Sequence, residues 1–532
     1  MATPDVEEFG ARIAAAYHAD GPALALGRGM LGGAVVPDAV VQVPAAMCNR
    51  HGLVAGATGT GKTKTLQLMA EQLSAMGVAV FAADVKGDLS GLLQPGAADE
   101  RVTTRATELG VDWAPAGNPV TFLSLGGLGS GVPVRATISA FGPSLIGKVL
   151  GANETQASSL TLVFDFADKA GLALLDLADL RAVLQYLTSD DGKADLSALG
   201  GLSSATAGVL LRKIVELEHQ GAEAFFGEPE FDTADLIRTT ADGKGVIHCL
   251  ELAAVQDKPK LFSTFLMWLL ADLFQTLPEI GDADKPKLCF FFDEAHLLFE
   301  DASKEFVAQV AQTVRLIRSK GVGVFFITQL PDDVPDDVLA QLGNRVQHAL
   351  RAFTPRDAKA LKAAVTTYPK TEDYDLEEDL TQLGIGDAMV TILSERGAPT
   401  PVVWTRMQPP TSLMAAVPAD QVDAAAHADP LWPRYAEEID RESAREKLTA
   451  KLAPAPEAAP APAAPAKAAK PRKGAGKGAR KGVRKGARKG KARSAPADAG
   501  SPVVDFLKSR EGRSAAGAVT RGAMGVLKGF MK

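Results

Sequence analysis

With 532 residues, of which 46% are hydrophobic and 23% are charged, and with a formal net charge of −7, the chain has the composition of a soluble globular protein of more than one domain. We expect a protein that neither spans a membrane nor is exported, because no apolar run approaches the ~20 residues that cross a bilayer and the start MATPDVEEFG lacks the regions of a signal peptide. The three cysteines have no metal-ligand spacing with histidine, so we expect a cytoplasmic protein with reduced cysteines in its core.

Residues 1–50 are expected to form a lead-in segment and not an independent domain. A short helical stretch at 6–17 precedes strand-like pieces at 34–36 and 40–43. Since the segment is too short for a core of its own, we expect it to pack beside the site that follows.

The most informative stretch, residues 56–63, reads GATGTGKT and fits the pattern G-x-x-x-x-G-K-[ST]. In such a P-loop successive backbone N–H groups hold nucleotide phosphates, and the glycines let the backbone approach the phosphate oxygens. We expect Lys62 at the β- and γ-phosphates and the Thr63 hydroxyl at Mg²⁺. The expected nucleotide-binding residues are Gly56, Ala57, Thr58, Gly59, Thr60, Gly61, Lys62, Thr63 and Thr65.

The flanking sequence supports this interpretation over a Gly/Thr-rich surface turn. An apolar strand-like piece at 52–55 comes before the loop, and a helical pattern at 64–73 follows it. The amino terminus of that helix would face the bound anion. The sequence therefore predicts an NTP-binding protein.

Residues 51–94 are expected to form the first part of an α/β core. The strand pattern at 78–84 ends in Asp84, and Asp88 follows in the next loop. In a doubly wound sheet such loops face the ligand, so both carboxylates are candidates to orient water or metal near the γ-phosphate. The alternative is that Asp88 only caps the following turn.

Residues 95–244 are expected to form a mostly helical insertion between two core strands. Strand patterns at 120–125 and 132–136 lead into helical segments at 144–150, 154–169, 177–187 and 206–218. Asn153 is expected to begin one of these helices, and Phe225 and Phe226 are expected in the core.

Residues 245–410 are expected to complete the core with a Walker B motif. A strand at 245–250 and an apolar helix at 261–277 precede the run at 287–294, an apolar strand that ends in Asp293 and Glu294. Asp293 would hold the hydration shell of Mg²⁺, and Glu294 would polarise the attacking water. The alternative is that Asp293 only caps a helix.

Three further strands complete this core. The strand at 323–329 ends in Gln329, whose amide could bind both the water and the γ-phosphate, and the strand at 344–351 carries an arginine at each end. A terminal hairpin is predicted from the segments 388–393 and 401–404.

The C-terminal part is expected to be a helical extension at 411–452, a disordered linker at 453–500 and an amphipathic segment at 501–532. Within the linker, residues 467–493 contain 13 Lys or Arg and no Asp or Glu, and the rest of the chain then has 44 basic and 64 acidic residues. Such a segment cannot bury enough apolar surface to fold. It is predicted to be a nucleic-acid-binding or self-docking arm, with a solubilising linker as the alternative.

The motif order GATGTGKT, an inserted domain, FFFDEAH and ITQ resembles RecA-type ATPases, in particular the HerA/FtsK branch of DNA-pumping motors. The phrases DVKGDLSGL, GANETQASSLTLVFDFAD and LLDLADLRAVL resemble a bacterial family of HerA helicase C-terminal-domain-like ATPases. The resemblance runs from about Ala23 to Trp404, with an echo at 512–529.

The resemblance implies a RecA-like P-loop NTPase core that binds ATP and Mg²⁺ and hydrolyses ATP. It implies residues 56–63 as Walker A, Asp293 and Glu294 as Walker B, and Gln329 as the sensor. HerA-like motors are hexamers in which an arginine enters the neighbouring site. Arg345 matches that finger best, and Arg351 and Arg356 are its rivals.

Three functions stay open at this point. The first is a hexameric DNA translocase or helicase with DNA in its pore loops and on its basic tail, and the second is an ATPase switch that drives assembly with a protein partner. A DEAH-box helicase is the third, suggested by residues 293–296, but no second helicase domain with paired arginines follows.

Overall fold

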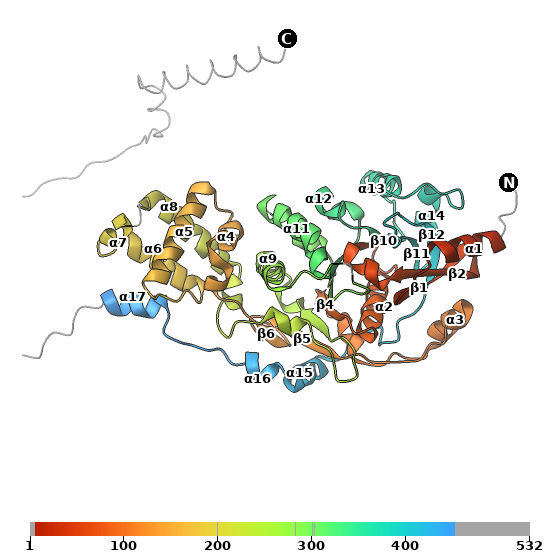
Figure 1. Ribbon diagram of the computed structural model, residues 1–532, viewed down its shortest axis with the longest axis horizontal. Coiled ribbons are helices and arrows are strands. Elements are labelled where there is room, and N and C mark those ends of the chain that lie inside the picture. Colours follow the sequence, from red (N-terminus) through yellow and green to blue (C-terminus); the bar gives the residue numbers. More distant parts are fainter. Residues whose placement is uncertain (1–5, 199–200, 282, 301, 303, 453–532) are drawn as a thin grey trace, which may run out of the picture. The chain divides into compact units, whose positions relative to one another are not determined.

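The computed structural model describes residues 6–198, 201–281, 283–300, 302 and 304–452 (Figure 1). These residues fall within one compact unit, Met1–Ala455, and build a 12-stranded sheet in the order β2-β1-β12-β11-β10-β3-β9-β8-β4-β7-β5-β6. The strands are β1 (Ala23–Leu31), β2 (Ala34–Pro44), β3 (Gly52–Ala55), β4 (Ala79–Asp84), β5 (Val120–Leu125), β6 (Val132–Val134), β7 (Ile247–Glu251), β8 (Leu288–Phe292), β9 (Val322–Thr328), β10 (Asn344–His348), β11 (Asp387–Thr391) and β12 (Val403–Met407).

The eight strands from β10 to β6 in this order run parallel to one another. Strands β8 and β9 are buried along their whole length, as expected for apolar runs covered on both faces. Alternate side chains enter opposite cores, since Phe290 and Phe292 belong to one hydrophobic cluster and Phe291 to the other. The predicted α/β class with a mainly parallel sheet is thus confirmed.

The other edge of the sheet is antiparallel. The hairpin predicted near the end of the core is confirmed, with Val390 opposite Val403. Strand β12 pairs with β1, so the lead-in segment adds two strands to the main sheet and its helix α1 packs on β2.

The helices cover both faces of the sheet and build the insertion. They are α1 (Val6–Ala16), α2 (Lys62–Ala75), α3 (Glu100–Leu109), α4 (Ile138–Val149), α5 (Glu154–Lys169), α6 (Leu177–Thr188), α7 (Lys193–Ala198), α8 (Ser204–His219), α9 (Pro259–Thr276), α10 (His296–Phe299), α11 (Lys304–Ile317), α12 (Asp336–Leu339), α13 (Pro355–Thr366), α14 (Leu376–Gln382), α15 (Ala419–Ala428), α16 (Trp432–Tyr435) and α17 (Ala444–Leu452). In the part of the chain that the structure describes, none of them is long and apolar enough to cross a membrane.

Helices α4 to α8 form the largely helical insertion, which the sequence predicts. Helix α5 begins with a capping box in which the Asn153 side chain accepts from the Gln156 N–H, and Phe225 and Phe226 are buried as expected. The strands β5 and β6 of the same stretch belong to the main sheet, because β5 pairs with β7. The segment 95–244 therefore contributes to the core as well as to the insertion.

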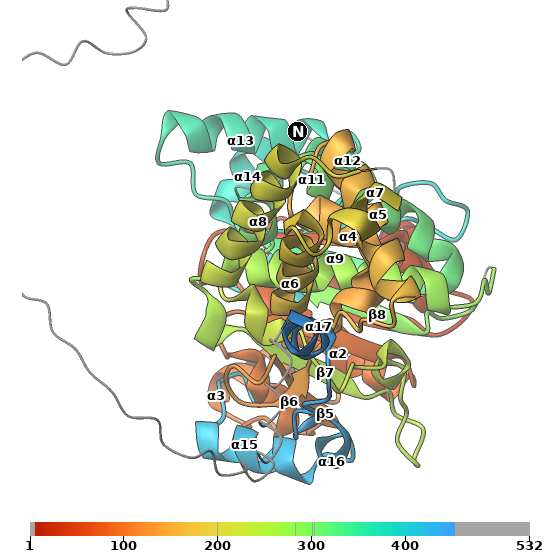
Figure 2. The same cartoon turned by 90° about the vertical axis from the view of Figure 1, so that its left-hand side faces the viewer.

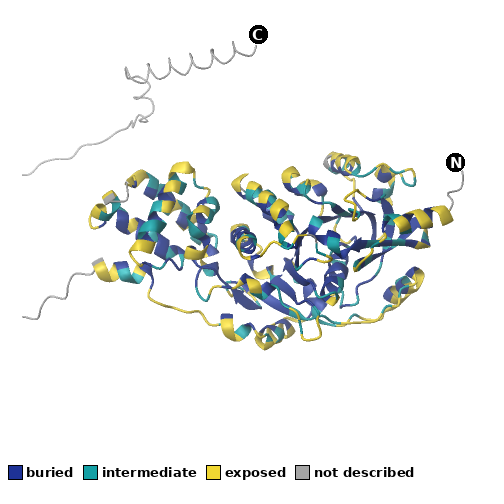
Figure 3. Cartoon of the chain, in the orientation of Figure 1, coloured by how far each residue is buried: buried dark blue, intermediate teal, exposed yellow. Residues whose placement is uncertain are grey.

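The segment 411–452 runs from the main sheet to the insertion. Helix α15 packs on β5, α16 packs on β6, and α17 packs on α6 (Figure 2). Buried residues follow the sheet and the inward sides of the helices (Figure 3), and the three cysteines are buried and free. The predicted disordered linker and amphipathic end, 453–532, lie outside the described residues.

Candidate functional site

The P-loop connects β3 to α2 and has the backbone that its glycines allow. Gly56, Gly59 and Gly61 have φ angles of 152°, 78° and 120°, which L side chains rarely adopt. A Cβ on Gly56 would lie 2.6 Å from the Cβ of His348, so this position has room only for a residue without a side chain. The Lys62 ammonium donates to the carbonyl oxygens of Gly56 at 2.7 Å and Ala57 at 3.2 Å. Lys62 therefore lies over its own loop, where phosphate oxygens would be received.

The remaining P-loop residues differ in exposure. Thr58 and Gly59 are exposed, Thr60 is buried, and Thr63 is half-buried at the second position of α2. The buried Thr65 hydroxyl lies 2.9 Å from Nε2 of His348 in β10. His348 Nδ1 lies 2.8 Å from the Asp387 carbonyl oxygen, which can only accept, so Nδ1 carries the proton and Thr65 donates to Nε2. Burial lowers the pKa of His348 to about 4, which keeps this ring neutral.

The Walker B carboxylate Asp293 follows β8 at the same edge of the sheet. Its Oδ1 accepts from the Glu294 N–H at 2.9 Å, and its Oδ2 is buried without a hydrogen-bond partner among the described residues. Burial raises the pKa of Asp293 to about 7. The short helix α10 begins after Ala295 and has no side-chain cap, so helix capping does not explain Asp293. A buried acceptor without a partner suits a hydrated divalent cation.

Glu294 is held by two basic side chains. Its backbone has a φ of 48°, in the left-handed region that few residues other than glycine adopt. The Lys86 ammonium contacts Oε1, and His296 Nδ1 lies 3.2 Å from Oε2. The contact with His296, together with the Lys86 ammonium, lowers the pKa of Glu294 to about 2 against the effect of burial. Glu294 is therefore a carboxylate at neutral pH.

Of the two acids near β4, Asp84 and not Asp88 caps the following turn. Asp84 accepts from the backbone N–H groups of Lys86, Gly87 and Leu89, so Asp84 caps this turn. The suggestion that Asp88 is the cap is wrong, because its side chain makes no capping bond and its Oδ1 is buried without a partner among the described residues. The reason is geometric, since the acid that ends a strand faces the N–H groups of the turn it leads into.

The sensor and arginine candidates lie at different ends of their strands. Gln329 follows β9 and is exposed. Arg345 pairs in register with Leu53 near the start of β3, and its guanidinium donates to the Thr367 hydroxyl at 2.5 Å. Because the P-loop follows the other end of β3, Arg345 does not reach the P-loop of its own chain. Arg351 is exposed in the segment after β10, and Arg356 stands at the start of α13.

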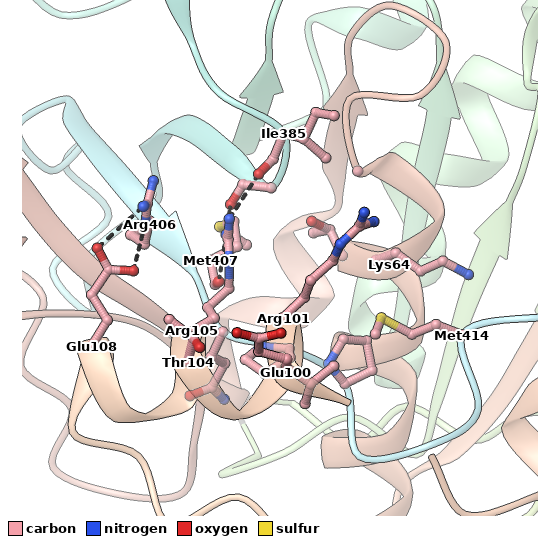
Figure 4. Close-up of a pocket in the computed structure, with 17 residues that line it drawn as sticks. Lys64, Glu100, Arg101, Thr104, Arg105, Glu108, Ile385, Arg406, Met407 and Met414 are labelled. Atoms are coloured by element: carbon pink, nitrogen blue, oxygen red, sulfur yellow. Dashed lines mark hydrogen bonds and ion pairs between the residues drawn. The ribbon is translucent and has the colours of Figure 1, made fainter. Parts of the chain in front are cut away.

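A pocket of about 740 Å³ opens beside the P-loop helix (Figure 4). Arg105 of α3 donates to the carbonyl oxygens of Ile385 and Gly386, both at 2.9 Å, and Arg406 pairs with Glu108 at 3.1 Å. These bonds attach α3 to the end of the sheet. The P-loop, α2, the end of β12 and the segment after it contribute the lining residues Gly61, Lys64, Thr65, Met407, Gln408, Pro409, Pro410 and Met414.

Three contacts at the candidate site are not predicted by the sequence motifs. They are the contacts of Lys86 and His296 with Glu294 and that of His348 with Thr65. Lys86 is part of the phrase DVKGDLSGL, which resembles the family, and its position after a strand ending in an acid is the available signal. The pairing of Ala83 with Phe292 brings the ends of β4 and β8 together and with them Lys86 and Glu294. That pairing joins residues more than 200 positions apart.

Glu71 of α2 ties the P-loop helix to the segment after β12. Its buried carboxylate accepts from the N–H groups of Thr411 at 2.7 Å and Ser412 at 3.1 Å, and from the Ser412 hydroxyl at 2.9 Å. Removing the acceptor would leave two buried donors of Ser412 and the partly buried N–H of Thr411 without this partner.

We expect Glu71→Ala to lower the free energy of unfolding by about 2–4 kcal/mol, because several buried hydrogen bonds are removed together. Glu71→Gln should lose about half as much, since the amide oxygen still accepts. The measurement is urea unfolding, followed by the shift of the midpoint at constant slope. Equal losses in the two variants would contradict the role given to the second oxygen.

The comparisons with known proteins place this site in a family. The family model described as helicase HerA-like C-terminal matches residues 32–532. The chain belongs to this HerA-like family. The family resemblance that the sequence shows is thereby confirmed, and the match spans the P-loop, the Walker B strand and the arginine candidates. A search among curated proteins finds no match.

Several solved structures are similar to this chain, and the one with a TM-score of 0.50 supports the fold. The plasmid coupling protein TrwB in complex with the non-hydrolysable ATP analogue ADPNP is 16% identical, with a TM-score of 0.50 over 77% of this chain and 94% of that chain. TrwB in complex with ADP and Mg²⁺ is 15% identical, with a TM-score of 0.49 over 76% and 95%. VirB4 of Thermoanaerobacter pseudethanolicus is 13% identical, with a TM-score of 0.46 over 73% and 97%.

Proposed function

We propose that this HerA-like protein binds ATP with Mg²⁺ and hydrolyses it. The observation that carries the proposal is the meeting of the P-loop and the Walker B acids at one edge of the parallel sheet. Only strand β9 lies between β3 and β8, so the P-loop and Asp293 are separated by a single strand. Burial lowers the pKa of Lys62, and the negative charges of Glu294 and Asp293 oppose this effect. This supports a site in which the three side chains lie close enough to interact electrostatically.

Each residue then has a task in the reaction. Lys62 and the backbone N–H groups of 56–63 receive the phosphates, and Thr63 and Asp293 hold Mg²⁺, which neutralises charge on the phosphates. Glu294 accepts a hydrogen from the attacking water, and Gln329 orients that water. The exposed position of Gln329 after β9 supports this assignment, because the side chain is free to reach a bound ligand.

The pocket beside α2 is the proposed place of the nucleobase. It begins at Gly61 and Thr65, next to the phosphate loop, and continues to the apolar side chains of Met407 and Met414. A cavity with apolar walls and a few polar groups suits a flat heterocycle. TrwB, whose fold is similar, has been solved with an ATP analogue, which supports ATP as the nucleotide.

We propose further that the protein works as a hexameric DNA translocase. Family membership supports a ring, and Arg345 would complete the site of the neighbouring subunit, since it cannot reach its own P-loop. The 13 basic residues of 467–493 support contact with DNA. The alternative is an ATPase switch that assembles with a protein partner, and the excess of acidic residues in the rest of the chain favours it, because such a surface repels DNA.

A chain that ends at Leu452 separates these two functions. Without the basic segment it should have a much lower affinity for duplex DNA, and the salt dependence of log affinity should become shallower by about 0.9 for each phosphate that the segment neutralises. A pore-threading motor should keep DNA-stimulated ATPase activity, because its inner loops still bind the strand. We expect that stimulation to be kept. The measurements are DNA binding at several salt concentrations and ATPase rates with and without DNA.

The matched control keeps the tail but replaces its 13 Lys and Arg with Gln. It should reproduce the reduced affinity if charge is the cause. Truncated protein that assembles into rings and hydrolyses ATP, yet does not respond to DNA at low salt, would favour the switch over the motor.

A further inference from the structure

Lys86 is a cation at the phosphate end of the sheet that has no task in the reaction described above. Its ammonium contacts Oε1 of Glu294, the residue proposed to polarise water. The Lys86 side chain is 47% exposed, whereas that of Glu294 is 5% exposed. The exposed partner of this pair is therefore the one with freedom to move.

The backbone that carries Lys86 is fixed. Asp84 is fully buried, and its carboxylate accepts from the N–H groups of Lys86 at 3.1 Å, Gly87 at 2.7 Å and Leu89 at 2.8 Å. Gly87 adds a φ of 78°, which favours glycine at this turn. A rigid turn with a flexible ammonium at its tip can deliver one charge to more than one nearby acceptor.

Only Oε1 of Glu294 accepts a hydrogen bond in this arrangement, because Oε2 is buried without a hydrogen-bond partner among the described residues. Lys86 contacts Oε1, and His296 lies 3.2 Å from Oε2. To polarise water, a carboxylate must accept a hydrogen from that water. The Lys86 ammonium occupies Oε1, one of the two oxygens that could do so, and its positive charge weakens the attraction of the whole carboxylate for a water hydrogen.

Lys86 also lies within electrostatic reach of the phosphate site. Burial lowers the pKa of Lys62 most, and among the neighbouring charges Glu294 and Asp293 raise it while Lys86 lowers it further. A triphosphate received by Lys62 would bring several negative charges into the same field. The γ-phosphate is then a stronger attractor for a mobile ammonium than a single carboxylate.

We propose that Lys86 detects the γ-phosphate of a bound nucleotide. Its ammonium exchanges between the Glu294 carboxylate and this terminal phosphate. When no triphosphate is bound, the ion pair restrains Glu294. When a triphosphate binds, Lys86 contacts the γ-phosphate and Glu294 is released to accept a hydrogen from water. This inference rests on the proposed function, and it makes Lys86 a specificity-determining residue for triphosphate over diphosphate.

The test compares the binding of ATPγS and ADP to the full-length protein with Mg²⁺ by isothermal titration calorimetry. Lys86→Met removes the charge and keeps the length of the side chain. It should weaken ATPγS binding by about 10-fold or more, the scale of one charged hydrogen bond, and leave ADP binding unchanged. Lys86→Arg should keep most of the preference for ATPγS. Because Lys86 is half exposed, both variants should keep the thermal stability of the wild type.

The variant Glu294→Gln separates direct contact from an indirect charge effect. In Lys86→Met alone, an unmasked Glu294 carboxylate would also repel the γ-phosphate. In the Glu294→Gln background that repulsion is absent, so direct contact predicts that Lys86→Met still weakens ATPγS binding by about 10-fold or more. No effect of Lys86→Met in that background, or an unchanged ATPγS-to-ADP ratio in the single variant, would overturn the proposal.

The proposed ATPase activity and the proposed exchange of Lys86 can be overturned separately. Wild-type protein that binds neither nucleotide would overturn both the ATPase and the exchange of Lys86. Wild-type protein that binds and hydrolyses ATP, with a nucleotide preference that does not depend on Lys86, would overturn the exchange alone.

Discussion

Replacing Glu294 with glutamine is expected to leave ATP binding intact and to slow hydrolysis at least ~100-fold, the scale of lost general-base catalysis. The amide keeps the shape of the side chain but loses the negative charge that attracts a hydrogen of the attacking water. Lys62→Ala should act differently, because it removes the ammonium that receives the phosphates and weakens nucleotide binding itself. The measurement is single-turnover hydrolysis together with ATP affinity.

Glu300→Gln is the matched control, since it makes the same change at an exposed site six residues along the chain. It should hydrolyse ATP at the wild-type rate. Wild-type turnover in Glu294→Gln would remove the role assigned to this carboxylate, and its neighbours Lys86 and His296 would then have a structural purpose only.

Replacing Arg345 with alanine is expected to keep ATP affinity and to lower the hydrolysis rate by roughly 10³-fold, the usual effect of removing an arginine finger. The reason is that Arg345 would stabilise transition-state charge in the neighbouring subunit of a ring. Mixing Arg345→Ala protein with Lys62→Ala protein should restore part of the activity. At some subunit interfaces the intact P-loop of an Arg345→Ala subunit then lies next to the intact Arg345 of a Lys62→Ala subunit.

Arg351→Ala and Arg396→Ala complete this test. Arg351 is the rival finger, exposed beyond the P-loop end of β10, and Arg396 is an exposed arginine in the turn of the terminal hairpin that serves as the control. A large loss in Arg351→Ala with none in Arg345→Ala would transfer the role. No rescue at any mixing ratio, together with a monomeric mass in ATP, would exclude a finger that acts in trans.

The local sequence pattern is sufficient to predict an element whose structure depends only on adjacent residues. The P-loop needs only glycines between a strand and a helix, and β8 needs only an apolar run that ends in acids, so both follow from a few adjacent residues. The capping box at Asn153 and the terminal hairpin are equally local. Periodicity therefore predicts the elements and the α/β class.

Long-range pairing has no comparable signal in one sequence. The segment 95–244 reads as an insertion, but β5 and β6 extend the sheet. The pairing of β5 with β7 and of β6 with β5 depends on backbone hydrogen bonds that leave no pattern in the side chains. The choice between Asp84 and Asp88 as the turn cap is similar. It depends on the direction in which the last residue of β4 points relative to the following N–H groups.

The sequence by itself determined that this chain has a P-loop, a Walker B strand and a family resemblance, because each rests on the order of neighbouring residues. The tertiary structure decided which charges meet. It placed β4 beside β8, and this brought Lys86 to Glu294; it placed Arg345 at the end of β10 that lies away from its own P-loop. The physical reason is that strand order is set by packing of both sheet faces over the whole chain, and a side chain finds its partner only after that order is fixed.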